Sequence, residues 1–114
     1  MFFGDLMVSF EEWSNIDLRV GLIEAIENVE GKDKLYKLTV NFGEEVRTVV
    51  SGIKLYYPNK EELEGKKVIF VYNLDPRKVV GIESQAMILG AINEGGKYKL
   101  SFIDDSVLAG TKME

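Results

Sequence analysis

The sequence predicts an all-β domain, on three observations. Apolar and polar residues alternate at a spacing of two in several segments, as they do in half-buried strands. Glycine-containing turns separate these segments, and helix signals occur only in short stretches. With 114 residues, 46% of them hydrophobic, and no linker or repeat, the chain fits one domain over residues 1–114.

The first elements are a short helix and a long strand. Ser9 and Glu12 have the spacing of a capping box, which predicts a helix beginning at Ser9. Alternation over residues 16–29 predicts the first strand. Gly21 lies in the middle of this strand, where glycine often permits a sharp bend at the corner of a barrel.

The next two strands form a hairpin. Residues 30–33 form a turn, and alternation over 36–42 predicts the second strand with Tyr36 and Phe42 in the core. Residues 43–45 then reverse the chain into a third strand over 46–51.

The second half begins with a helical segment. Pro58 precedes an acidic stretch that Gly65 closes, which predicts one or two helical turns. Apolar residues then predict a fourth strand over 67–73, a fifth over 85–92 and a last one over 98–103.

The order of these elements favours an OB-fold, a five-stranded Greek-key barrel. The barrel would span about residues 16–92, followed by a C-terminal β extension over 93–114. An SH3-like barrel is the alternative, but a helix between the third and fourth strands favours the OB-fold.

Composition disfavours catalysis. The chain has neither cysteine nor histidine, so it lacks the usual neutral-pH base and the commonest metal ligands. No motif arranges its carboxylates and lysines as nucleophile, base and orienting group. We therefore expect no enzyme activity, no metal site and no cofactor.

The charge distribution is more informative than the net charge of −5. Residues 1–31 contain seven acids and one arginine, whereas residues 32–43 and 66–81 are locally basic. The predicted fold places Lys32 and Lys34 in the loop after the first strand, and Arg77 and Lys78 in the loop after the fourth. Lys37 would project outward from the second strand. These positions indicate a polyanion-binding edge; an ordinary solvated surface is the alternative.

The chain resembles the tRNA-binding domain family, whose members are fused to some methionyl-tRNA synthetases or occur as free-standing tRNA-binding proteins. The similarity spans nearly the whole chain. It departs from the family at residues 30–32, where Glu-Gly-Lys stands in place of a common His-Pro pair. The segments that carry it are 17–21, 33–36, 50–52, 73–78, Gly81 and 84–89.

The resemblance implies recognition of tRNA by shape and backbone, often by a homodimer built through the C-terminal extension. It places Asn73, Ser84 and Met87 at the binding surface. Each also has a structural interpretation: Asn73 as a turn cap, Ser84 as a partner of nearby backbone, and Met87 as core. Arg77 and Lys78 are expected to contact phosphate, with ordinary turn cations as the alternative.

The leading hypothesis is thus a cytoplasmic, non-catalytic tRNA-binding protein without a membrane segment. Methionyl-tRNA synthetase is the candidate protein partner, and a homodimer is expected. The alternative is a chaperone-like module that binds peptides in an apolar groove near Met87.

Overall fold

The computed structural model describes residues 6–114 and shows an all-β protein with little helix. The first five residues of the predicted domain lie outside this range. The elements are α1 (Phe10–Trp13), β1 (Leu18–Val29), β2 (Lys32–Asn41), β3 (Val46–Ser51), the 3-10 helix η2 (Lys60–Glu62), β4 (Lys67–Val71), β5 (Arg77–Val79), β6 (Ile82–Ser84), β7 (Met87–Ile88), β8 (Gly90–Ile92) and β9 (Tyr98–Leu100).

The main sheet has five antiparallel strands in the order β3-β2-β1-β4-β7. This is the order of an OB-type barrel, in which the first strand pairs with both the second and the fourth. β1 serves both neighbours because its first part pairs with β4 and its second part with β2.

Gly21 lies where β1 passes from one partner to the other, as its predicted role at a barrel corner requires. A Cβ there would stand 2.5 Å from Val40 Cγ1 and 2.7 Å from the Phe70 ring. The register with β2 shifts between Ile23 and Ala25, which marks a bulge just after the glycine. Gly21 therefore allows close packing inside the bend, and the bulge increases the local twist.

Individual hydrogen bonds connect β3 to the segment beside the other edge strand, although no strand pairing within residues 6–114 closes the barrel. The Gln85 amide donates to the Thr48 carbonyl oxygen, and the Thr48 amide donates to Gln85 Oε1, both at 2.8 Å. The Val50 amide donates to Ser84 Oγ at 3.0 Å. The result is an open, OB-like barrel.

The core fills this barrel. Tyr36 and Phe42 are buried as predicted, and Phe42 packs edge-on against Phe70 with ring centroids 5.3 Å apart. The Tyr36 hydroxyl donates to the Tyr57 carbonyl oxygen at 2.7 Å, so this core tyrosine has a partner for its polar atom. Leu63, which follows η2, is fully buried in the same cluster.

The predicted fifth strand is wrong in its extent. Residues 85–92 divide into β7, which joins the main sheet, and β8, which pairs with β9 in a separate hairpin. At the junction, a Cβ on Gly90 would stand 2.5 Å from the Lys99 carbonyl oxygen. Because the two hairpin strands approach each other closely here, the position requires a residue without a side chain. The last strand is also shorter than predicted and ends at Leu100.

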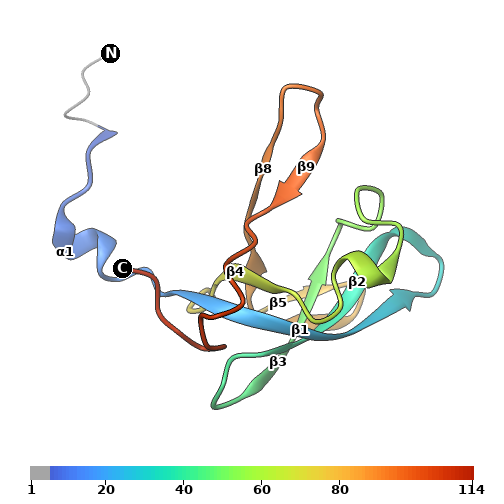
Figure 1. Cartoon of the computed structure of the whole chain (residues 1–114), viewed down its shortest axis with the longest axis horizontal. Coiled ribbons are helices and arrows are strands. Elements are labelled where there is room, and N and C mark those ends of the chain that lie inside the picture. The colour runs from blue at the N-terminus through green and yellow to red at the C-terminus, as the bar shows by residue number, and fades with distance from the viewer. Residues whose placement is uncertain (1–5) are drawn as a thin grey trace.

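Two parts of the chain project from the barrel. The β8–β9 hairpin stands away from the main sheet, and α1 lies on an arm at the opposite end from the β1–β2 turn (Figure 1). The radius of gyration, 15.1 Å, accordingly exceeds the roughly 13 Å of a compact domain of about this size. The capping box at Ser9 and Glu12 is present as predicted.

The C-terminal segment returns to its own barrel. The Val20 amide donates to the Thr111 carbonyl oxygen at 2.9 Å, and the Met113 amide donates to the Leu18 carbonyl oxygen at 2.7 Å. These bonds give hydrogen-bond partners to backbone groups in the first part of β1, which does not pair with β2. Much of the predicted extension is thus part of the barrel wall.

Candidate nucleic-acid interface

The first group of predicted site residues lies on β2 rather than in a loop. The turn between β1 and β2 consists of Glu30 and Gly31, so the placement of Lys32 and Lys34 in that loop is wrong. The strand starts earlier than expected because Lys32 pairs directly with Val29. Both lysines are exposed.

Lys37 faces outward from β2, as its position in the alternation predicts. Its Nζ lies 3.7 Å from Glu27 Oε2 on the neighbouring strand. An ion pair at this exposed position contributes little to stability, but it offsets the positive charge locally. Lys37 is therefore less available to an anionic ligand than the two exposed lysines before it.

The second group lies on a small hairpin between β4 and β7. Arg77 and Lys78 belong to β5, which pairs with β6, so the prediction of an irregular loop is wrong in detail. Val80 and Gly81 form the two-residue turn with φ values of 47° and 82°. Two positive φ values match the type I′ turn that suits the twist of hairpin strands.

The strand conformation separates these two cations. Successive side chains of a strand point to opposite faces, so Arg77 and Lys78 do not act as one cluster. Arg77 pairs with Ser84 across the hairpin and lines a groove on the barrel. Lys78 pairs with Glu83, whose charge partly offsets its own. Arg77 is therefore the sharper candidate for contact with an anion.

The groove beside Arg77 has a volume of about 340 Å³ and a mainly apolar lining. Leu35 and Val50 contribute from β2 and β3, and Leu74 and Met87 contribute from the segments around the hairpin. Met87 is 47% exposed and lines this groove rather than filling the core. Leu35 also lines an adjacent hollow with Lys32 and Lys34, so these two cations lie beside the groove and Arg77 is the cation that lines it.

Asn73 and Ser84 make structural hydrogen bonds. Asn73 Oδ1 accepts from the Asp17 amide at 2.8 Å, and Asn73 Nδ2 donates to the Asn15 carbonyl oxygen at 2.7 Å. Ser84 is only 6% exposed, and its Oγ accepts from the Val50 amide. Asn73 ties the N-terminal arm to the end of β4, and Ser84 ties the hairpin to β3.

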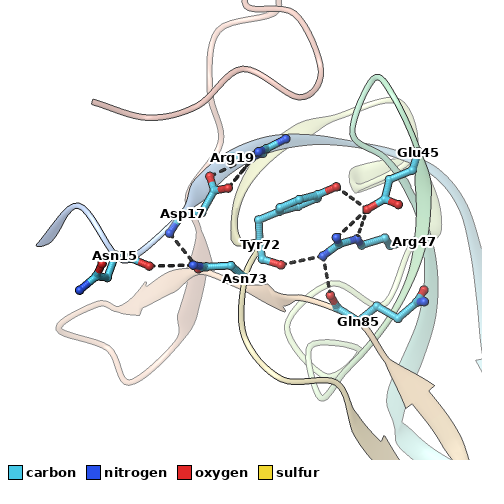
Figure 2. A network of polar contacts seen from close by, with 8 residues as sticks. All are labelled: Asn15, Asp17, Arg19, Glu45, Arg47, Tyr72, Asn73 and Gln85. Carbon is cyan, nitrogen blue, oxygen red and sulfur yellow. Dashed lines mark hydrogen bonds and ion pairs between the residues drawn. The ribbon is translucent and has the colours of Figure 1, made fainter. Parts of the chain in front are cut away.

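A polar network that the sequence did not predict joins the hairpin to the barrel. Arg47 donates from one terminal nitrogen to the carbonyl oxygens of Tyr72, at 2.6 Å, and Gln85, at 3.1 Å. These two carbonyls lie at either end of the segment that forms the hairpin. Figure 2 shows the arginine reaching across from β3 to both of them. Arg47 thus clamps the base of the hairpin.

Tyr72 lies at the centre of this network. The guanidinium carbons of Arg47 and Arg19 stand 3.5 Å and 4.2 Å from its ring centroid (Figure 2). Glu45 accepts hydrogen bonds from the Tyr72 hydroxyl and, at 2.6 Å, from Arg47 Nε. Asp17 forms an ion pair with Arg19, at 2.9 Å. Both acid–arginine pairs share one sequence signal, an acid just before a strand and an arginine two residues later on that strand.

The network shifts the pKa values of its members. The hydrogen bonds from Tyr72 and Arg47 lower the pKa of Glu45. Burial, followed by the hydrogen bond to Glu45, raises the pKa of Tyr72. The carboxylate therefore stays ionised and the phenol stays protonated around neutral pH, which preserves the clamp.

The basic segment 66–81 does not form one patch. Lys66 and Lys67 lie at the start of β4, whereas Arg77 lies beyond its other end. Lys67 Nζ donates to the Asp105 carbonyl oxygen at 2.6 Å, which ties it to the C-terminal segment. Only the second half of the segment reaches the groove.

An apolar surface lies at the N-terminal arm. Phe10 is highly exposed, and it lines a hollow with Trp13, Ile16 and Met113 beside the C-terminus. Among residues 6–114, no helix is long and apolar enough to cross a membrane.

Comparison with known proteins places the chain in a family. The family described as "Putative tRNA binding domain" matches residues 18–112. The methionine–tRNA ligase of Caldanaerobacter subterraneus is 50% identical over 106 residues, which cover 93% of this chain and 16% of that protein. The methionine–tRNA ligase of Deinococcus radiodurans is 47% identical over 110 residues, covering 96% of this chain and 16% of that protein. The chain therefore spans about a sixth of the length of these relatives.

Solved structures agree with this placement. A MetRS-related protein from Pyrococcus horikoshii superposes with a TM-score of 0.88 at 42% identity, covering 95% of this chain and 98% of the other. The CsaA chaperone protein of Picrophilus torridus gives a TM-score of 0.83 at 32% identity, covering 95% and 100%. With its sequence and fold both matched over nearly the full length, the chain belongs to the tRNA-binding domain family.

Proposed function

We propose that this protein binds tRNA without catalysing a reaction, using the groove that Arg77 lines and the adjacent surface that carries Lys34. The observation that carries the proposal is the position of Arg77 in the lining of a mainly apolar groove on an OB-like barrel, with Lys34 in an adjacent hollow. Cations hold a phosphate backbone without reading its sequence. Lys32 and Lys78 would add charge at the margins, and Lys37 would contribute less because of Glu27.

The other predicted site residues have supporting roles in this proposal. Asn73 and Ser84 hold the hairpin and the arm in place through the hydrogen bonds described above. Met87 contacts the ligand from the floor of the groove. The site of action would be the cytoplasm, where tRNA is charged and used.

The protein would act alone or docked to methionyl-tRNA synthetase. The similarity to one segment of methionine–tRNA ligases supports the second arrangement. In the docked arrangement the barrel would raise the local concentration of tRNA near the enzyme. Binding of purified synthetase to the immobilised protein, with and without tRNA, would test the docking.

A homodimer is the proposed assembly. Exposed apolar residues on the two projecting parts support it, among them Phe10 on the arm and Ile92 on β8. A two-fold pairing of barrels would offer tRNA two copies of the cationic surface. Because residues 110–113 line β1 of their own barrel, the β8–β9 hairpin is the part of the extension best placed to reach a partner.

Size-exclusion chromatography with light scattering would test binding and assembly together. We expect the protein to elute as a dimer and to comigrate with bulk tRNA at low salt. Arg77→Ala should weaken binding severalfold to tenfold, since it removes one charged contact. Lys66→Ala removes the same charge away from the groove and serves as the control. Failure of the wild-type protein to comigrate with tRNA would overturn the proposal.

Peptide binding is the second candidate function. The similarity to CsaA chaperone proteins and the apolar lining of the groove favour it. An unfolded peptide that displaced tRNA from the wild-type protein would show that both ligands use the groove. A peptide that bound while tRNA did not would favour the chaperone-like function alone.

A further inference from the structure

The groove beside Arg77 has an apolar lining as well as aromatic and polar groups, a combination that a phosphate-binding site does not need. Leu74, Val79 and Met87 contribute to the apolar lining from the hairpin side. Leu74 and Met87 are both about half exposed, so they present apolar surface to a ligand. A backbone phosphate would gain nothing from this lining.

The same groove carries aromatic and polar groups. Tyr98, from β9, contributes an aromatic side chain to the lining, next to Tyr56 with ring centroids 6.1 Å apart. Ser51 and Asp75 add a hydroxyl and a carboxylate. A nucleobase has a flat face that packs against apolar and aromatic side chains, and amino or imino groups that donate to such acceptors.

Charge decides between the possible occupants. Arg77 lines the groove itself, and exposed Lys34 lines an adjacent hollow that shares Leu35 with the groove. An unstacked nucleotide has an apolar base between negatively charged phosphates, so its chemistry matches this arrangement. An apolar peptide segment would use the lining but would give Arg77 no anionic partner.

We propose that the groove holds an unstacked nucleobase of a single-stranded part of the RNA, while Arg77 contacts an adjacent phosphate. This inference rests on the proposed tRNA-binding function and adds to it a preference for unpaired nucleotides. RNA-binding proteins commonly take splayed bases from single-stranded ends and loops in this way. The barrel thus distinguishes RNA with unpaired nucleotides from a duplex of the same charge.

Gly52 offers a variant that closes the groove and leaves its charges intact. This lining residue has no positive φ, and a Cβ built on it would meet no heavy atom nearer than 4.0 Å, the distance to Leu35 Cδ2 and Lys34 O. The Cβ of Gly52→Val therefore meets no backbone clash, and the valine side chain adds apolar volume to the groove lining. Met87→Ala is the complementary variant, because it removes apolar surface from an exposed position. Val46→Ala is the control, since Val46 is exposed on β3 outside the groove.

The experiment compares two fluorescein-labelled probes of equal charge, a uridine hexamer and an abasic ribose-phosphate hexamer. Fluorescence anisotropy with the full-length protein should show about tenfold tighter binding of the uridine hexamer, in line with one stacked base. Gly52→Val and Met87→Ala should bring this ratio toward one, with the abasic affinity unchanged. Val46→Ala should keep the wild-type ratio. Circular dichroism of each variant confirms that it is folded.

The outcomes separate this inference from the proposed function. Equal affinity of the wild-type protein for the two hexamers, together with salt-dependent tRNA binding, would overturn the base site and leave tRNA binding intact. Absence of tRNA binding would overturn both. Displacement of the uridine hexamer by an unfolded peptide, with no discrimination against the abasic probe, would assign the groove to peptides and overturn the inference.

Discussion

Gly110 shows how one residue without a side chain fixes the path of the C-terminal segment. Its φ is 89°, and a Cβ there would lie 2.1 Å from the Phe42 carbonyl oxygen. Its amide donates to the Val20 carbonyl oxygen at 2.7 Å. No periodic pattern signals such a contact, because it joins residues far apart in the sequence. The predictions from sequence therefore omitted it.

Gly110→Ala should destabilise the protein by about 2–4 kcal/mol, since it combines backbone strain with a clash against backbone. Gly65→Ala is the matched control. Gly65 has a similar φ of 79° but no heavy atom within 4 Å of the added Cβ, so it carries only the strain, about 1 kcal/mol. Urea unfolding of both variants measures the difference. Equal losses would contradict the close approach at Phe42.

Glu45 should contribute to the pH dependence of stability. Because its folded-state pKa lies below the ordinary 4.5, its stabilising effect is present above that pH and is lost as pH falls through the folded pKa. The melting temperature of Glu45→Gln should be below the wild-type value at neutral pH. The gap between the two proteins should narrow on acidification below about pH 4.5. Glu44→Gln, outside the described hydrogen bonds of the network, should show no such convergence; a constant gap for Glu45→Gln would contradict the role.

Among the elements, the strands with a clear period of two were predictable and the hairpin was not. β2 buries alternate residues such as Tyr36 and Leu38, so its pattern is visible in the sequence. The segment around Pro76 instead contains turn-forming residues and a valine at a positive φ, which valine rarely adopts. Contacts with the rest of the barrel outweigh this local preference. A loop was therefore the natural but incorrect prediction.

Arg47 should position the hairpin, although it does not line the groove. Arg47→Ala removes the hydrogen bonds to the carbonyls of Tyr72 and Gln85, so amides of residues 77–84 should exchange with solvent at least tenfold faster. The affinity for tRNA should fall as well, because Arg77 loses its fixed place. Arg47→Lys should restore part of both losses by keeping a donor.

The control for this test is Arg19→Ala. Arg19 also stacks on Tyr72, but its hydrogen bonds go to Asp17 and not to the ends of the hairpin. Its loss should leave exchange in the hairpin near the wild-type rate. Similar exchange in both variants would show that the stack on Tyr72, and not the clamp, holds the hairpin.

For the whole molecule, element order was enough to predict an all-β, OB-like barrel, because strand alternation and the position of the short helix are local features. The convergence of Arg77 and Leu35 on one groove also follows from that topology. The separation of the cations of residues 66–81 into two places does not follow from the topology, since it depends on which end of β4 each cation occupies. Nor does the separation of Arg77 from Lys78, which requires the hairpin to be known.

The salt dependence of tRNA binding tests the central claim most directly. For the wild-type protein, the logarithm of the affinity should fall linearly with the logarithm of salt concentration. Arg77→Ala should lower the affinity and reduce the magnitude of this slope by about 1, the signature of one lost phosphate contact, whereas Lys66→Ala should leave the slope unchanged. An unchanged affinity and slope for Arg77→Ala would contradict the assignment of the groove edge as the tRNA-binding surface.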